Sequence, residues 1–158
     1  MKKLFLIAAI AVFSFGAYAQ TGTMEIMPKL GYQTEFKRAL LGVEGRYYLD
    51  NNIRLAPDVS VLFPNNRITG LDVNLNVHYT IPLGNDFTFY PLVGGAMLNN
   101  RWSPKEGDAN SWTDFGLSVG AGIQYQLYGY GYLNFEFRYT IIEGKDPAYF
   151  MLGYAIRL

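Results

Sequence analysis

Ten charged side chains recur at alternate positions of the chain, and their types allow either an ion pathway or a set of ion pairs. A pathway would need a hydrated interior lined by both charges. Because a buried charge without a partner is expensively desolvated, equal numbers of both signs favour pairing. We therefore expect an ion-pair network that plugs the interior. Its five basic and five acidic members are Lys29, Arg46, Arg54, Arg138, Arg157, Glu25, Glu44, Asp58, Asp72 and Glu136.

His78 is the only histidine of the chain, and Thr80 follows it two residues later. One histidine excludes a site with several histidine ligands, and the absence of cysteine excludes thiolate ligands and disulfide bonds. A histidine and a hydroxyl perform nucleophilic catalysis only when their geometry with an acid is correct. We expect His78 to fill the interior as a polar residue, with no catalytic residue, metal or cofactor.

A third group of candidates, Arg101, Trp102, Lys105 and Trp112, lies in a connection predicted over 99–112. Tryptophan beside charge can contact a sugar or a partner protein, and binding residues are often carried by loops on a rigid scaffold. Alternatively, the two tryptophans flank the loop as aromatic residues do at a membrane interface. We favour the interfacial role and keep surface binding as the alternative.

These candidates are carried by eight segments in which apolar side chains alternate with polar or small ones. In the clearest segment, Leu71, Val73 and Leu75 face away from Asp72 and Asn74. The more apolar face carries no Asp, Glu, Lys or Arg in any segment, which is typical of transmembrane β-strands. The pattern predicts an all-β fold, an eight-stranded antiparallel up-and-down transmembrane β-barrel with a side-chain-filled lumen. Its segments cover 24–33, 41–49, 53–61, 71–81, 87–98, 113–127, 132–141 and 149–158.

The alternation also restricts which charged residues can meet. Inward residues have odd numbers in the first segment and even numbers in the second. The residue numbers of two inward residues that lie opposite each other on these strands must therefore add up to an odd number. A sum of 73 places Lys29 opposite Glu44, and a sum of 71 places Glu25 opposite Arg46. At the seam of the barrel, Arg157 and Glu25 fall at the same end of neighbouring strands.

The connections alternate in length, as expected for a barrel with tight periplasmic turns and longer outer loops. All the outer loops are short, which argues against a tall sheet protruding from the barrel. Pro28, Pro57 and Pro91 lie on the apolar face of a barrel that offers no free edge, so we expect β-bulges beside them. The tight turns cover 50–52, 82–86 and 128–131, and the other connections cover 34–38, 63–68, 99–112 and 142–147.

Residues 1–19 have the features of a secretory signal peptide: Lys2 and Lys3, then an apolar stretch, then Ala17-Tyr18-Ala19. Cleavage there leaves one barrel domain over 20–158 with eleven basic and thirteen acidic groups. The resulting net charge of −2 gives no support to nucleic-acid binding, which requires a basic surface.

The signal peptide, the eight segments and the closing stretch 153–158 together resemble the small eight-stranded outer-membrane barrel family typified by OmpX and the transmembrane domain of OmpA. The resemblance implies an outer-membrane location and contact with outer-membrane lipid, periplasmic chaperones and the barrel-assembly machinery. It also implies that Gly153, Ile156 and Leu158 form the assembly signal of the last strand. Two positions depart from that signal: Leu158, where Phe is commonest, and Met151, where a polar residue is preferred.

We therefore expect a small, monomeric outer-membrane protein with a structural or cell-surface interaction role, neither an enzyme nor an open pore. One alternative is a lipid A modifying enzyme, because the lipid A deacylases pair a histidine with a serine two residues on. Here that position is Thr80, and His78 is expected near the periplasmic end instead of the outer one. A second alternative is a secreted lipocalin-like barrel with its apolar face turned inward around a ligand.

Overall fold

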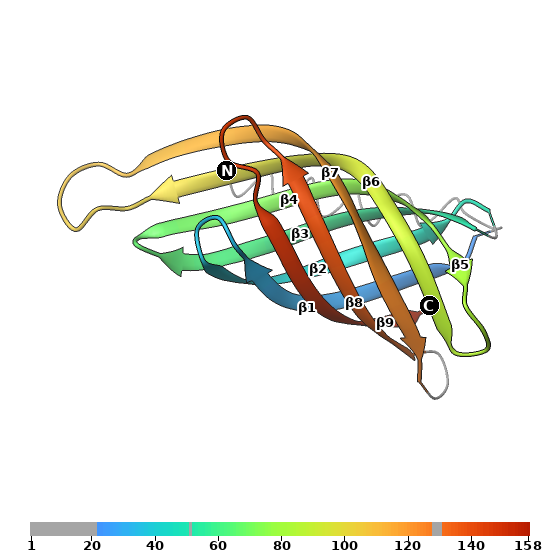
Figure 1. Ribbon diagram of the computed structural model, residues 1–158. Coiled ribbons are helices and arrows are strands. Elements are labelled where there is room, and N and C mark those ends of the chain that lie inside the picture. Colours follow the sequence, from blue (N-terminus) through green and yellow to red (C-terminus); the bar gives the residue numbers. More distant parts are fainter. Residues whose placement is uncertain (1–21, 51, 128–130) are drawn as a thin grey trace.

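The structure is a computed structural model and describes residues 22–50, 52–127 and 131–158. The predicted signal peptide, 1–19, and most of the predicted turn at 128–131 lie outside the described residues. The strands form one sheet that curves into a barrel (Figure 1). They are β1 (Met24–Gln33), β2 (Arg38–Tyr48), β3 (Ile53–Asn65), β4 (Ile68–Tyr79), β5 (Ile81–Pro82), β6 (Phe87–Trp102), β7 (Asn110–Gln126), β8 (Gly131–Ile141) and β9 (Ala148–Arg157).

Antiparallel pairing continues around the whole barrel, and the contact between β1 and β9 closes it. The short strand β5 pairs with β6 in the register that β4 already has, so the wall contains eight strands. The prediction of an eight-stranded antiparallel barrel is thus confirmed. Within the described ranges, no helix has the length and apolar character needed to cross a membrane.

The two ends of the barrel differ. At one end, called the turn end, β1 begins and β9 ends, and β4 connects to β6 through β5. At the other, called the loop end, the strands are joined by residues 34–37, 66–67, 103–109 and 142–147. Inward-facing side chains lie at both ends of the barrel. The position of each one is given by its distance along the lumen from the turn end to the loop end.

Side chains alternate between a buried inner face and an exposed outer face. Leu75 and Phe115 are 53% and 75% exposed on the outside, whereas Asn74 and Asn76 are buried inside. The lipocalin-like alternative requires an apolar interior and an outer polar face, and it is therefore wrong.

The register between β1 and β2 is the one whose partners sum to 71. Glu25 lies opposite Arg46, and Lys29 lies opposite Gly42. The register that sets Lys29 directly opposite Glu44 is not adopted.

The three prolines of the outer face sit in the strands without bulges. On one side of each proline the ladder is continuous, with Val43, Leu75 and Ala121 opposite Pro28, Pro57 and Pro91 in turn. On the other side the ladder skips the proline and resumes in the same register. The expected bulges were wrong, because leaving out a local pairing accommodates the missing N–H without shifting a strand.

Two hairpins at the loop end are longer than predicted. Only Asn66 and Arg67 separate β3 from β4, and their φ angles of 48° and 64° fit a type I′ turn. β6 and β7 continue through most of the predicted loop 99–112, leaving residues 103–109 as the connection. Both predicted loops were too long. Outside a membrane, two strands can pair through their backbones without an alternation of polar and apolar side chains, so the sequence pattern does not mark these strand ends.

The β6–β7 hairpin protrudes beyond its neighbours at the loop end (Figure 1). Pairing of β7 with β8 begins at Leu117 opposite Ile141, so residues 110–116 pair with β6 alone. One short hairpin therefore extends beyond the barrel wall.

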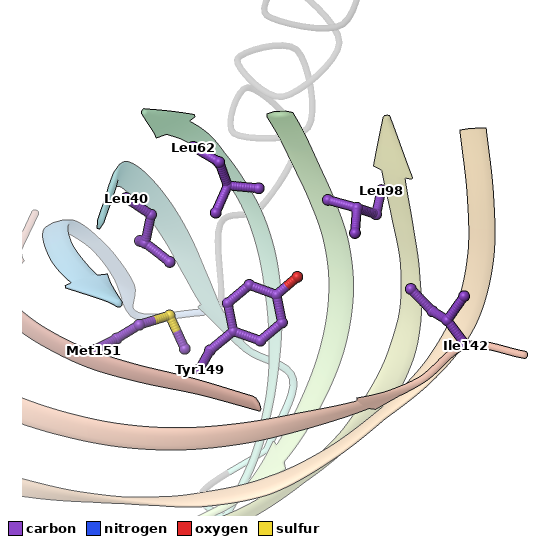
Figure 2. Packing of buried hydrophobic residues seen from close by; sticks show 6 residues of the cluster. All are labelled: Leu40, Leu62, Leu98, Ile142, Tyr149 and Met151. Carbon is purple, nitrogen blue, oxygen red and sulfur yellow. The ribbon is translucent and has the colours of Figure 1, made fainter. Parts of the chain in front are cut away.

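An apolar cluster fills the loop end of the lumen, and we call it the apolar layer. Its side chains come from four strands and from the residue that follows β8, and they converge on the interior (Figure 2). The members are Leu40, Leu62, Leu98, Ile142, Tyr149 and Met151. Burial in this layer explains why an apolar residue, Met151, stands at a position where the assembly signal prefers a polar one.

Candidate functional site in the barrel lumen

The charged residues predicted for the interior occupy the inner face of the barrel. The five carboxylates are buried, as are Lys29, Arg46, Arg54 and Arg138. Arg157, at the turn end, differs because 41% of its side chain is exposed. Strand alternation alone places these residues inside, since each has the inward parity of its strand.

Five of them form a chain of alternating charge across the lumen, which we call the charged layer. Lys29 Nζ lies 3.3 Å from Glu44 Oε2 and also pairs with Asp58. Arg138 Nη1 lies 2.7 Å from Asp58 Oδ2, and its Nη2 lies 2.5 Å from Asp72 Oδ2. The layer therefore ties β1 and β2 to β3, β4 and β8.

A second group of charges lies nearer the turn end. Arg46 Nε is 2.6 Å from Glu44 Oε1, so Glu44 joins this group to the charged layer. Arg46, Arg54 and Arg157 each place a nitrogen 3.8 Å from a carboxylate oxygen of Glu25. One carboxylate at the seam thus faces three guanidinium groups.

Glu136 and Arg38 differ from the predicted network, in which five basic residues pair with five acidic ones. Glu136 has no Lys or Arg nitrogen within 4.0 Å among the described residues, and it accepts a hydrogen bond from the Tyr90 hydroxyl at 2.8 Å. Arg38 is a further buried cation that the sequence analysis assigned to a loop. Its even number, shared with the inward residues of β2, is the signal that could have found it.

Tyr90 is a second buried residue that the sequence analysis missed. Its ring stacks on His78 with 4.6 Å between the ring centroids. A Cβ on Gly122 would collide with this ring, so the glycine makes room for it. The alternation of side chains indicates that Tyr90 points inward. Nothing in the sequence indicates that its ring contacts His78 or Gly122.

Glu44, His78 and Glu136 are the one buried group in the described part of the chain whose ligand atoms could surround a metal ion, all lying within 4.8 Å of one another. Arg54 Nε donates a hydrogen bond to His78 Nδ1 at 3.0 Å. In a neutral imidazole the proton must then be on Nε2, which leaves neither nitrogen with a free lone pair. This arrangement leaves His78 without a lone pair that could bind a metal ion.

His78 and Thr80 do not form part of a catalytic triad. The Thr80 hydroxyl donates to the backbone carbonyl of Asn52 at 3.1 Å. His78 Nδ1 accepts a hydrogen bond from the Arg54 guanidinium. In a catalytic triad this nitrogen would instead donate a hydrogen bond to an acid. Both side chains are buried on the inner face, away from the outer apolar surface.

The four predicted surface-binding residues are not brought together. Trp102 and Trp112 have the inward parity of their strands, Arg101 has the outward parity, and Lys105 lies in the connecting loop. The two tryptophans are therefore not on the outer apolar face that an interfacial residue requires. Instead, Lys145 Nζ lies 5.2 Å from the centre of the Trp112 ring.

Lys145 also pairs with Asp114, with 2.9 Å between Nζ and Oδ2. This contact joins the 142–147 loop to the β6–β7 hairpin. Sequence reasoning missed it because the partners belong to different hairpins.

The predicted assembly signal lies along β9 and just beyond it. Gly153 is buried opposite Lys29 and Asn134, whereas Ile156 and Leu158 are exposed on the outer side. The backbone N–H of Leu158 donates to the Met24 carbonyl at 2.9 Å, which extends the seam by one residue.

Comparisons with known proteins agree with this architecture. The family model described as outer membrane protein beta-barrel domain matches residues 5–155. No curated protein sequence matches the chain.

Solved structures of similar fold include three bacterial outer-membrane or surface proteins. The N-terminal β-barrel domain of Pseudomonas aeruginosa OprF is 17% identical, with a TM-score of 0.75 over 87% of this chain and 100% of that one. The Yersinia pestis attachment invasion locus protein Ail, in complex with the heparin analogue sucrose octasulfate, is 16% identical, with a TM-score of 0.63 over 87% and 97%. Neisserial surface protein A is 15% identical, with a TM-score of 0.66 over 87% and 96%. The chain therefore belongs to the outer-membrane protein β-barrel domain family, and its barrel spans the outer membrane.

Proposed function

We propose that this protein is a closed, non-catalytic barrel that acts at the cell surface through its protruding β6–β7 hairpin. The observation that carries the proposal is the filled lumen, in which the charged layer and the apolar layer occupy successive depths. A barrel of eight strands is just wide enough for side chains to fill its interior. Transport through such an interior would require both layers to rearrange.

Contacts across the lumen support the closed state. Arg46, on β2, reaches Gln124 on β7 at 3.1 Å and Asn134 on β8 at 3.0 Å. Arg138, on β8, reaches Asp58 and Asp72 on β3 and β4. Because these side chains bridge opposite walls, they obstruct the path that an ion would take.

The proposal of a closed barrel is tested by conductance in a planar lipid bilayer. The purified wild-type protein should show no stable ion conductance. Steady open channels from the wild type would contradict the closed barrel.

The chemistry around His78 supports a non-catalytic role and gives the lipid A modifying alternative little support. The outer apolar face is where lipid A would contact this barrel, and His78 lies behind it, in the lumen. His78→Ala should leave the acylation pattern of lipid A in cells unchanged, as measured by mass spectrometry. A changed pattern would favour the enzyme.

The surface role rests on the hairpin and not on a basic surface. Ail was solved with a heparin analogue, a polyanion. At the loop end of this chain, in the connections and in the β6–β7 hairpin strands, basic and acidic groups nearly cancel. The basic residues are Lys37, Arg67, Arg101, Lys105 and Lys145, and the acidic ones are Glu35, Glu106, Asp108, Asp114, Glu143 and Asp146. A protein partner that contacts the hairpin therefore fits better than a sulfated sugar.

Shortening the hairpin tests this role directly. Replacing 103–109 by Asn-Gly should preserve the different gel mobilities of unboiled and boiled protein, while it reduces adherence of expressing cells to immobilised matrix proteins. Glu35→Ala combined with Lys37→Ala, in another loop, serves as the control and should retain adherence. Equal adherence by the wild type and the shortened variant would contradict the proposal.

A further inference from the structure

Arg38 is a buried cation without a carboxylate partner in the described part of the chain. It is the first residue of β2 and only 1% exposed, at the loop end of the lumen. The other four fully buried Lys and Arg side chains each have a carboxylate oxygen within 4.0 Å. Arg38 therefore differs from every other basic residue of the interior.

The partners of Arg38 are all electrically neutral. Its Nε and Nη2 donate to Gln33 Oε1 at 2.9 and 2.8 Å, and Nη2 also donates to Asn100 Oδ1 at 2.8 Å. The guanidinium carbon lies 4.6 Å from the centre of the Phe36 ring. These contacts fix the orientation of the guanidinium but place no carboxylate of the described residues within 4.0 Å of it, and a buried charge without a close counter-ion is costly.

Two hydrogen-bond donors remain unused at this point. Arg38 Nη1 and Asn100 Nδ2 are both buried and have no partner. The hydrogen bond from Arg38 Nη2 to Asn100 Oδ1 places the guanidinium and the amide that carry these nitrogens side by side. Nη1 lies beside Gly70 and Leu62, since a Cβ on Gly70 would be 2.8 Å from Nη1 and 2.7 Å from Leu62 Cδ1.

We propose that Arg38 and Asn100 bind a small monatomic anion, a halide such as chloride, at the loop end of the lumen. An anion there would compensate the charge of Arg38 and accept hydrogen bonds from both free donors. Two donors suit a halide, because a tetrahedral oxyanion would leave most of its oxygens without partners beside the apolar Leu62. The site is independent of the surface role proposed above.

The test uses the full barrel purified in a non-ionic detergent, with sodium bromide and sodium gluconate compared at equal ionic strength. Bromide should raise the midpoint of thermal unfolding of the wild type by about 2 to 4 °C. Asn100→Asp places a carboxylate beside Arg38, so it should raise the midpoint in gluconate and abolish the response to bromide. Asn99→Asp, the same change on the outward face, is the matched control and should respond as the wild type does.

Arg38→Gln provides a second variant in case Asn100→Asp does not fold. It removes the charge and should also abolish the response to bromide. Crystals grown in bromide should show anomalous scattering beside Arg38 and Asn100. The proposal is overturned if wild-type unfolding does not distinguish bromide from gluconate, or if both Asn100→Asp and Arg38→Gln respond as the wild type does. It is also overturned if sulfate raises the midpoint more than bromide does and both variants abolish that rise, because the site would then select an oxyanion.

Discussion

The charged layer and the apolar layer fill the same lumen by different interactions. In the charged layer, Arg138 holds two carboxylates at distances of 2.5 and 2.7 Å, and each contact depends on direction. In the apolar layer, side chains such as Leu62 and Leu98 are equally buried but interact without directional requirements (Figure 2). The comparison teaches that complete burial can be achieved either by a specific network or by close packing. The two solutions should fail differently when a side chain is removed.

The largest effect should come from removing the central cation of the charged layer. Arg138→Met leaves Asp72 buried without a cation, and we expect a loss of roughly 3 to 5 kcal/mol in the free energy of unfolding. Urea unfolding in lipid vesicles, followed by tryptophan fluorescence, measures the change. Combining Arg138→Met with Asp72→Asn should restore much of the loss, and a double variant no better than the single one would show that the pairing is not the cause.

Removing a side chain from the apolar layer should cost somewhat less. Leu98→Ala loses buried apolar contacts and leaves a cavity, and we expect a loss of about 3 kcal/mol. Leu117→Ala, on the exposed outer face, is the matched control and should cost less. Leu98→Met keeps the volume and should cost less than about 1.5 kcal/mol. The layer would not be tightly packed if all three variants unfolded at the same urea concentration.

Tyr149 belongs to the apolar layer yet touches the polar network, so it shows how the two regions meet. Its hydroxyl accepts a hydrogen bond from Gln33 Nε2 at 2.8 Å, and Arg138 lies over its ring at 4.6 Å. Tyr149→Phe keeps the ring and removes only the hydroxyl, so we expect a loss of about 1 kcal/mol in the same unfolding assay. A loss as large as that of Arg138→Met would mean that the layers form one network.

The smallest effect should come from the ion pair outside the lumen. Lys145 and Asp114 are partly exposed, with 29% and 26% of their side chains accessible, so water screens their attraction. Lys145→Ala should change the free energy of unfolding by about 0.5 kcal/mol or less, and the difference should vanish in concentrated salt. A loss comparable to that of the buried pairs would show that burial is not what separates them.

Alternation in the sequence was sufficient to predict the barrel and the side of the wall on which each charge lies. It was insufficient to predict partners, because these depend on the stagger of strands that are distant in sequence. Lys29 shows the difference: its direct neighbour across the ladder is Gly42, whereas its ion pairs are made with Glu44 and Asp58.

The alternation of polar and apolar residues also did not predict where the strands end. Arg38 was assigned to a loop because the alternation becomes clear only at Leu41, and its role in the lumen was missed for that reason. The two-residue turn at Asn66 and Arg67 requires left-handed backbone conformations at both residues. The surrounding polar residues do not predict these conformations. The apolar layer was missed because its residues are interspersed with polar ones in each strand and gather only in the closed barrel.

The seam between β1 and β9 determines when the barrel can form. Glu25 and Arg157 face each other there, although almost the whole described chain separates them. Contacts between residues so distant in sequence slow folding, because a long segment must be ordered before they can form. Until β9 joins β1, each incomplete edge exposes backbone groups that can pair with another chain. Protection from aggregation therefore comes only with the final strand.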